Sequence, residues 1–198
     1  MKQFKVFIDF EKEEQYLNTM AKRGYTLKKY SNFGIYHFTE GQPQDLKYRI
    51  DYRYFHTKED FEDYKALFED AGWQHVYGTS DSLNQYFLPV NNCADNNIFS
   101  SEKSAASRYK HMYEMCYLNV VIAMIYFVIV LISCDFNLSN IAFLTPGLWE
   151  MQGEKFWSAF FFELPFVFLR IVPVVLFLGM GVIYAIWANK AKRMYKKS

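Results

Sequence analysis

The sequence predicts an α+β domain followed by a two-helix transmembrane hairpin. Three observations lead to this fold class. The first ninety residues show one strand–helix–strand–strand pattern twice, and two later stretches are apolar for about twenty residues each. Charge is also unevenly divided, because residues 1–114 carry 15 Lys and Arg with 17 Asp and Glu, whereas residues 115–198 carry 7 and 4.

The first unit begins with an alternating strand at residues 3–8, followed by a helix at 11–23. Asp9 is placed to cap the helix, and Gly24 is placed to end it in the left-handed conformation. Acidic residues lie near the start of this helix, as the helix dipole favours: Glu11, Glu13 and Glu14. Its apolar stripe is Tyr16, Leu17, Met20 and Ala21. Strands at 25–30 and 35–39 follow, with a turn at 32–34.

The second unit repeats this order 48 residues later. Residues 46–54 alternate apolar and charged side chains, which is typical of a strand with one buried and one wet face. Thr57 and Asp60 resemble a capping box, and Gly72 ends the helix that follows. Strands are expected at 75–78 and 85–90. Two such βαββ units predict a ferredoxin-like antiparallel sheet with two helices on one face, over residues 1–90.

A linker at 91–112 leads to the two predicted transmembrane helices, at 113–135 and 164–188. The loop between them, 136–163, is net acidic and contains an aromatic segment at 149–162 that we expect to lie at the membrane interface as a short helix. Basic residues precede the first apolar run and fill the tail at 189–198. The positive-inside rule therefore predicts a multi-pass protein of the bacterial cytoplasmic membrane, with both termini cytoplasmic.

Several motifs of the soluble half resemble one bacterial membrane family, known as domain of unknown function 2812. The similarity covers about residues 4–90 and is carried by Tyr16-Leu17-Asn18 with Gly24-Tyr25, by Tyr48-Arg49-Ile50-Asp51, and by Ala71-Gly72-Trp73. The membrane half matches in layout only. The resemblance implies no settled activity. It does imply a gene neighbourhood with PadR-like transcriptional regulators, and hence a regulated membrane response.

Two groups of charged side chains are candidate sites. Alternating charges on one strand are expected to form a solvated or cross-strand-paired face, with docking of a protein partner as the functional alternative: Lys47, Arg49, Asp51 and Arg53. Glu163 and Arg170 flank the start of the second apolar run. Arg170 is expected to snorkel to the interface, and the alternative is a functional charge pair within the membrane.

No catalytic site, cofactor site or metal site is expected. The four histidines are scattered, and neither a nucleophile with a base nor a glycine-rich phosphate loop occurs. The three cysteines, Cys93, Cys116 and Cys134, predict no disulfide framework. Residues 1–90 are net negative, which argues against nucleic acid as a partner.

The function hypothesis is therefore a membrane-anchored regulatory or sensory protein, not an enzyme, whose cytoplasmic domain docks a protein partner. The alternative is an accessory subunit of a transporter or other envelope complex. Two helices rarely enclose a transport path, so a stand-alone transporter would need a homo-oligomer. In both readings the lipid bilayer is a partner.

Overall fold

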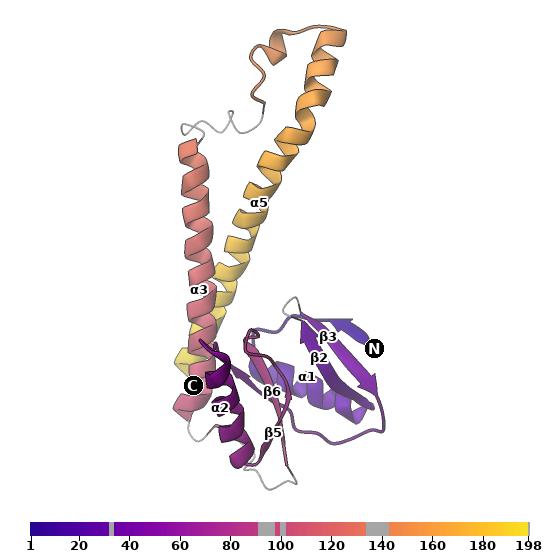
Figure 1. The fold of residues 1–198 in the computed structure, drawn as a ribbon, viewed down its shortest axis with the longest axis vertical. Coiled ribbons are helices and arrows are strands. Elements are labelled where there is room, and N and C mark those ends of the chain that lie inside the picture. The colour runs from indigo at the N-terminus through magenta and orange to yellow at the C-terminus, as the bar shows by residue number, and fades with distance from the viewer. Residues whose placement is uncertain (32–33, 91–97, 100–101, 134–142, 198) are drawn as a thin grey trace. The chain divides into compact units, whose positions relative to one another are not determined.

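The computed structural model describes residues 1–31, 34–90, 98–99, 102–133 and 143–197 (Figure 1). The chain divides into two compact units, which are described separately below. Unit 1 comprises Met1–Tyr113 together with Asn189–Ser198, and unit 2 comprises Glu114–Ala188. The predicted α+β domain followed by a helical hairpin is confirmed.

The first βαββ motif of unit 1 consists of β1 (Lys2–Phe4), α1 (Phe10–Lys22), β2 (Tyr25–Ser31) and β3 (Ile35–Glu40). Its antiparallel strands lie in the order β1-β3-β2. The Asp9 side chain accepts hydrogen bonds from the backbone N–H groups of Glu11 and Lys12, so the expected N-cap is present. Gly24 has φ +83°, the left-handed conformation that glycine adopts without a Cβ clash. The predicted turn at 32–34 lies mostly outside the described residues.

The second motif consists of β4 (Arg49–Tyr52), α2 (Lys58–Asp70), β5 (Trp73–Tyr77) and β6 (Asn84–Pro89), with the strand order β4-β6-β5. The capping box of Thr57 and Asp60 is confirmed, since each residue's side chain accepts from the other's backbone N–H. β4 is shorter than the alternating run 46–54 predicted. β4 pairs with β6 over Arg49–Tyr52 only.

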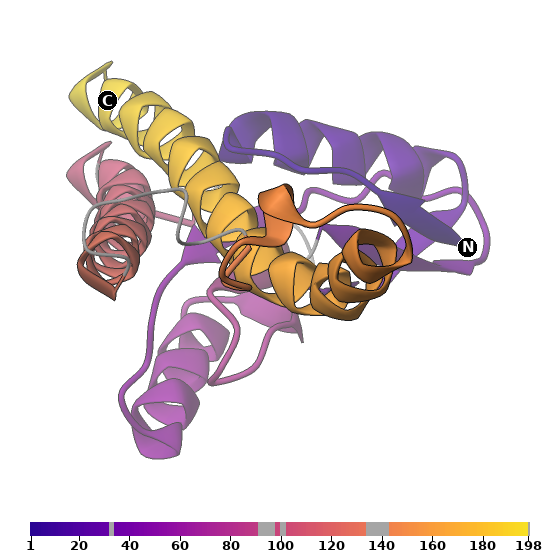
Figure 2. The ribbon, with the colours of Figure 1, turned by 90° about the horizontal axis from the view of Figure 1, so that it is seen from above.

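The six strands form two three-stranded sheets, where the sequence suggested one continuous sheet. Edge strands β2 and β5 lie beside each other. At this junction the backbone N–H of Leu27 donates to the hydroxyl of Tyr48, 3.1 Å away, so a buried side chain occupies a position where a neighbouring strand would supply a carbonyl. α1 packs on β2 and α2 on β5, and Figures 1 and 2 show the two helices apart from one another.

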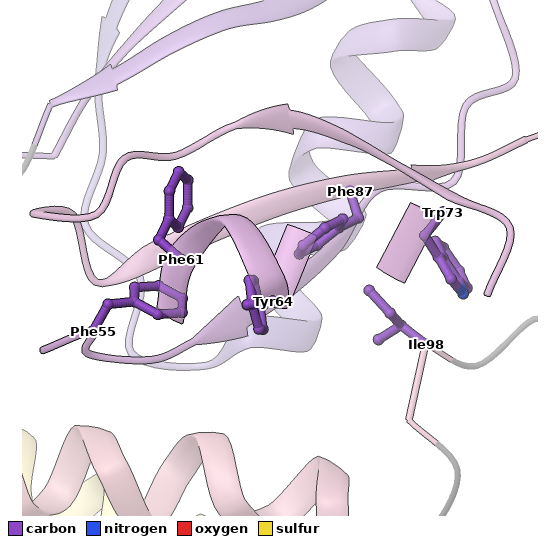
Figure 3. Close-up of a cluster of buried hydrophobic side chains, with 6 residues drawn as sticks. All are labelled: Phe55, Phe61, Tyr64, Trp73, Phe87 and Ile98. Carbon is purple, nitrogen blue, oxygen red and sulfur yellow. The ribbon is translucent and has the colours of Figure 1, made fainter. Parts of the chain in front are cut away.

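An aromatic core lies between α2 and its sheet (Figure 3). It includes side chains from the apolar face of α2 and from the inward faces of β5 and β6. The helical and strand periodicities place these side chains on one side of each element. Tyr64 lies within 5.9 Å of the Phe87 ring, centroid to centroid. The buried members are Phe55, Phe61, Tyr64, Trp73, Phe87 and Ile98.

Unit 2 contains most of two long helices, α3 (Glu102–Ser133) and α5 (Glu154–Lys197), and a short 3₁₀ turn, η1 (Leu148–Glu150). Both helices are long and apolar enough to cross a membrane, and few of their apolar side chains are covered by the protein. The helices approach at Gly181, where an added Cβ would lie 3.0 Å from that of Ala123. The aromatic segment 149–162 is no separate helix, because η1 ends at Glu150 and residues 154–162 form the start of α5.

Candidate functional site: a buried charge cluster

Two neighbouring glutamates on α1 are buried, although the sequence indicates for them only a favourable interaction with the helix dipole. The exposed fraction of Glu13 is 2% and that of Glu14 is 7%. Buried charges require partners, since an isolated carboxylate in a protein interior is strongly destabilising. The partners of these two residues come from both sheets and from α3.

Glu13 is held by two tyrosine hydroxyls. Tyr36 of β3 and Tyr86 of β6 each donate to the same carboxylate oxygen, Oε1, at 2.7 Å. The ring of Tyr30 lies beside both phenols, with centroid distances of 4.8 Å to Tyr36 and 5.7 Å to Tyr86. Burial raises the pKa of Glu13 to about 7, and the two phenolic hydrogen bonds oppose this rise. Glu13 is therefore a group that titrates near neutrality at the junction of the two sheets.

Glu14 is held by cations and by backbone. Arg108 of α3 places Nη1 at 2.8 Å from Glu14 Oε1, and Nη1 of Arg49 lies 3.4 Å from Oε2. The backbone N–H of Ile50 donates to Oε1 at 3.1 Å. Burial raises the pKa of Glu14, while Arg108 lowers it through its charge and its hydrogen bond.

Arg108 is the most enclosed cation of the cluster, with an exposed fraction of 5%. Its Nη1 also donates to the carbonyl of Ile50 at 2.9 Å. The guanidinium lies over three aromatic rings, with centroid distances of 5.1 Å to Phe10, 5.1 Å to Phe99 and 5.4 Å to Tyr109. Within the described part of the chain its Nε has no hydrogen-bond partner. From the sequence, Arg108 is one of the basic residues that precede the first predicted transmembrane helix, and its burial is not indicated there.

The cluster thus joins five elements: α1, α3, β3 of the first sheet, and β4 and β6 of the second. Its chemistry is that of ion pairing and proton binding. A nucleophile beside a base was not found among the described residues, and these residues contain no group of three or more His, Cys, Asp or Glu side chains arranged to hold a metal ion.

The four residues of the predicted docking face do not share one environment. Asp51 is buried, with an exposed fraction of 4%, and accepts a 2.8 Å hydrogen bond from the Tyr64 hydroxyl of α2. Arg49 points to Glu14, as described above. Arg53 is half exposed and lies 3.9 Å from Asp51. Lys47 is exposed and lines a cavity of about 480 Å³ between β2 and β5.

The structure brings the second predicted pair together. Arg170 Nη1 lies 3.7 Å from Glu163 Oε1. Glu163 is buried and also accepts hydrogen bonds from the backbone N–H groups of Leu144 and Thr145, so it fastens the chain before η1 to α5. Of the cysteines, Cys116 is buried as a free thiol, and Cys93 and Cys134 lie outside the described residues.

Comparison with known proteins gives one family. The model of a protein of unknown function, DUF2812, matches residues 9–121. That range is more than half of the chain and contains Glu13, Glu14 and Arg108, whereas α5 lies beyond it. Neither the curated proteins nor the solved structures contain a match.

Proposed function

For this chain, which belongs to the DUF2812 family, we propose the role of a membrane-anchored regulatory or sensory protein. In this proposal the α+β domain lies in the cytoplasm, detects the position of α3, and docks a protein partner accordingly. One observation carries the proposal. The helix that places Arg108 in the buried cluster continues without a break into an apolar segment long enough to cross a membrane.

A continuous helix transmits displacement along its axis, because its backbone hydrogen bonds resist local stretching. A shift of the apolar part of α3 therefore moves Arg108. Arg108 cannot move alone, since a buried carboxylate that loses its cation costs about 3–5 kcal/mol. The carboxylate belongs to α1 and shares the guanidinium with the carbonyl of Ile50 in β4. Movement in the membrane thus reaches α1 and β4 first.

The distribution of basic residues supports the cytoplasmic location. Lys110 and His111 follow Arg108 on α3, and the end of α5 carries exposed Lys190, Lys192 and Arg193. Both basic ends belong to unit 1, as the positive-inside rule expects of a cytoplasmic domain. Reporter fusions to the C-terminus check this point. A reporter that is active only in the cytoplasm should be active, and a reporter that is active only outside the cell should be silent.

The transmission is tested by hydrogen exchange on the full chain in nanodiscs. Thinner or thicker bilayers change the tilt and depth of membrane helices. Exchange in α1 and β4 should respond to bilayer thickness. Exchange in α2 serves as an internal control, since among the described residues Arg108 contacts α1, β4, Phe99 and Tyr109 but no residue of α2. The matched variant carries Arg108→Met with Glu14→Gln, which removes both charges while keeping an acceptor for the Ile50 N–H.

In the double variant the response of α1 and β4 should disappear. An unchanged response there, or the absence of any response in the natural chain, would refute transmission through the cluster. An exposed control, Arg193→Gln, should behave like the natural chain.

A second role, as accessory subunit of a membrane complex, is favoured by one surface. An apolar groove of about 410 Å³ runs along α3 and is lined from Tyr117 to Ile129. A helix of another membrane protein, or lipid, fits such a surface. A pull-down from native membranes separates the two roles, because a soluble regulator supports the first and a polytopic protein supports the second.

A further inference from the structure

The buried cluster contains more acid than its enclosed cation can neutralise. Of two adjacent carboxylates, Glu13 and Glu14, the second is paired with both cations: Arg108, which is almost fully enclosed, and Arg49, whose side chain is 24% exposed. Like charges held close together in a protein interior rarely both ionise near neutrality unless cations compensate them. The state of ionisation therefore depends on whether Arg108 is present.

We infer that withdrawal of Arg108 from the cluster is coupled to uptake of one proton by Glu13, so that the domain holds the base of α3 more tightly as the pH rises above neutrality. This inference rests on the proposed function, since it specifies what regulates the movement of α3. The step is a simple protonation, in which water or buffer supplies the proton and an O–H bond forms on the Glu13 carboxylate.

The surroundings of Glu13 give the coupling its sign. Burial is the main cause that raises the pKa of Glu13, and the charge of the adjacent Glu14 adds to it. Arg108 lies 2.8 Å from Glu14 and offsets that charge, so its removal leaves Glu14 uncompensated and raises the pKa of Glu13 above its value of about 7 in the docked state. The titratable and charged groups that face Glu13 are Glu14 of α1, Tyr30 of β2, Tyr36 of β3, Tyr86 of β6 and Arg108 of α3.

Water that enters when α3 withdraws does not reverse this sign. Glu13 is held by Tyr36 and Tyr86 at the sheet junction, whereas Glu14 is the residue that contacts α3. Opening the α3 side therefore hydrates Glu14 first and leaves Glu13 enclosed. The undocked state binds more protons than the docked state, so reciprocity requires raised pH to favour docking.

The test uses the full chain in nanodiscs of one fixed thickness, between pH 6 and 9. Amide exchange is followed in the segment of α3 that lies in unit 1, residues 102–113. The natural chain is compared with Glu13→Gln at each pH, so that the intrinsic pH dependence of exchange cancels. Relative protection should begin to rise near pH 7, by at most about tenfold per pH unit for one proton. Glu13→Gln, which imitates the protonated form, should stay at the low-pH level.

Two further variants keep the test decisive. Glu11→Gln removes an exposed carboxylate from the same helix and should reproduce the natural profile. Tyr86→Phe removes one donor from ionised Glu13 and should move the rise to higher pH, which also supplies a readout if Glu13→Gln folds poorly. Parallel profiles for the natural chain and Glu13→Gln, or protection that falls with pH, would overturn the inference. The proposed function is tested separately: it would be overturned if exchange in α1 and β4 of the natural chain did not respond to bilayer thickness.

Discussion

The replacement Glu13→Gln makes a sharp prediction about how stability depends on pH. Burial raises the pKa of Glu13 from 4.5 to about 7. At pH values between these two pKa values, the Glu13 carboxyl is protonated in the native state and ionised in the unfolded chain. Stability must fall as pH rises across this interval, because the unfolded state binds fewer protons there.

The size of the effect follows from the same two values. Each pKa unit corresponds to about 1.4 kcal/mol, so the full interval amounts to about 3 kcal/mol. The loss begins near pH 4.5 and is complete above pH 7. Glu14 and other groups also make the free energy of unfolding depend on pH. Their contributions cancel in the difference between the natural chain and Glu13→Gln. Relative to the variant, the natural chain should lose about 3 kcal/mol between pH 4.5 and 7.5.

Urea unfolding of unit 1, with the full chain in nanodiscs, measures this difference. Trp73 is buried in the aromatic core and serves as the fluorescent probe. Trp149, Trp157 and Trp187 are replaced by Phe in both proteins so that only the probe emits. The reasoning is refuted if the difference stays below about 1 kcal/mol across the range, or if the natural chain gains stability relative to the variant as pH rises. The exposed Glu11→Gln should change neither curve.

Three further changes have defined outcomes. Thr57→Ala removes the cap of α2 and should cost about 1 kcal/mol in the same urea assay. Tyr64→Phe deprives buried Asp51 of a hydroxyl donor and should cost about 1–3 kcal/mol, whereas a purely packing role would leave stability unchanged. Gly181→Leu should force α3 and α5 apart at Ala123, seen as a longer distance between spin labels on the two helices; an unaltered distance would contradict the close approach.

The elements that the sequence predicted well are those set by local chemistry. Asp9 and Thr57 cap their helices as expected, because a short polar side chain just before an amphipathic helix can accept hydrogen bonds from the free backbone N–H groups of the first turn. Gly24 and Gly72 both have φ +83°, the conformation their positions after the helices indicated. The separation into two sheets could not be predicted in this way, since it depends on how Tyr48 packs against β2, a contact between distant residues.

The cluster escaped prediction for a related reason. Glutamates in the first turns of a helix normally interact with its dipole at the surface. Yet Phe10, Glu13, Leu17 and Met20 follow the spacing of one buried helix face, and all four are buried. The position of a carboxylate within this apolar helix face was the sequence feature that could have indicated the buried cluster. Its partner was not predictable, because Arg108 lies 94 residues away from Glu14 along the chain.

A buried ion pair is a poor way to gain stability, which bears on why this one exists. Desolvation of two charges commonly cancels their attraction, so apolar or neutral groups of similar volume often replace such a pair at little cost. Arg108→Gln alone should therefore cost about 3–5 kcal/mol, because it leaves the Glu14 carboxylate enclosed without its main cation.

Arg108→Met combined with Glu14→Gln should recover most of that loss, since no buried charge remains unpaired at this position. Urea unfolding of Arg108→Met, of Glu14→Gln and of the double variant gives the coupling energy. A stable double variant that no longer responds to bilayer thickness would mean that the pair serves transmission. A double variant as unstable as Arg108→Gln would instead assign the pair a structural role, and the proposed connection between α3 and the domain would lose its main support.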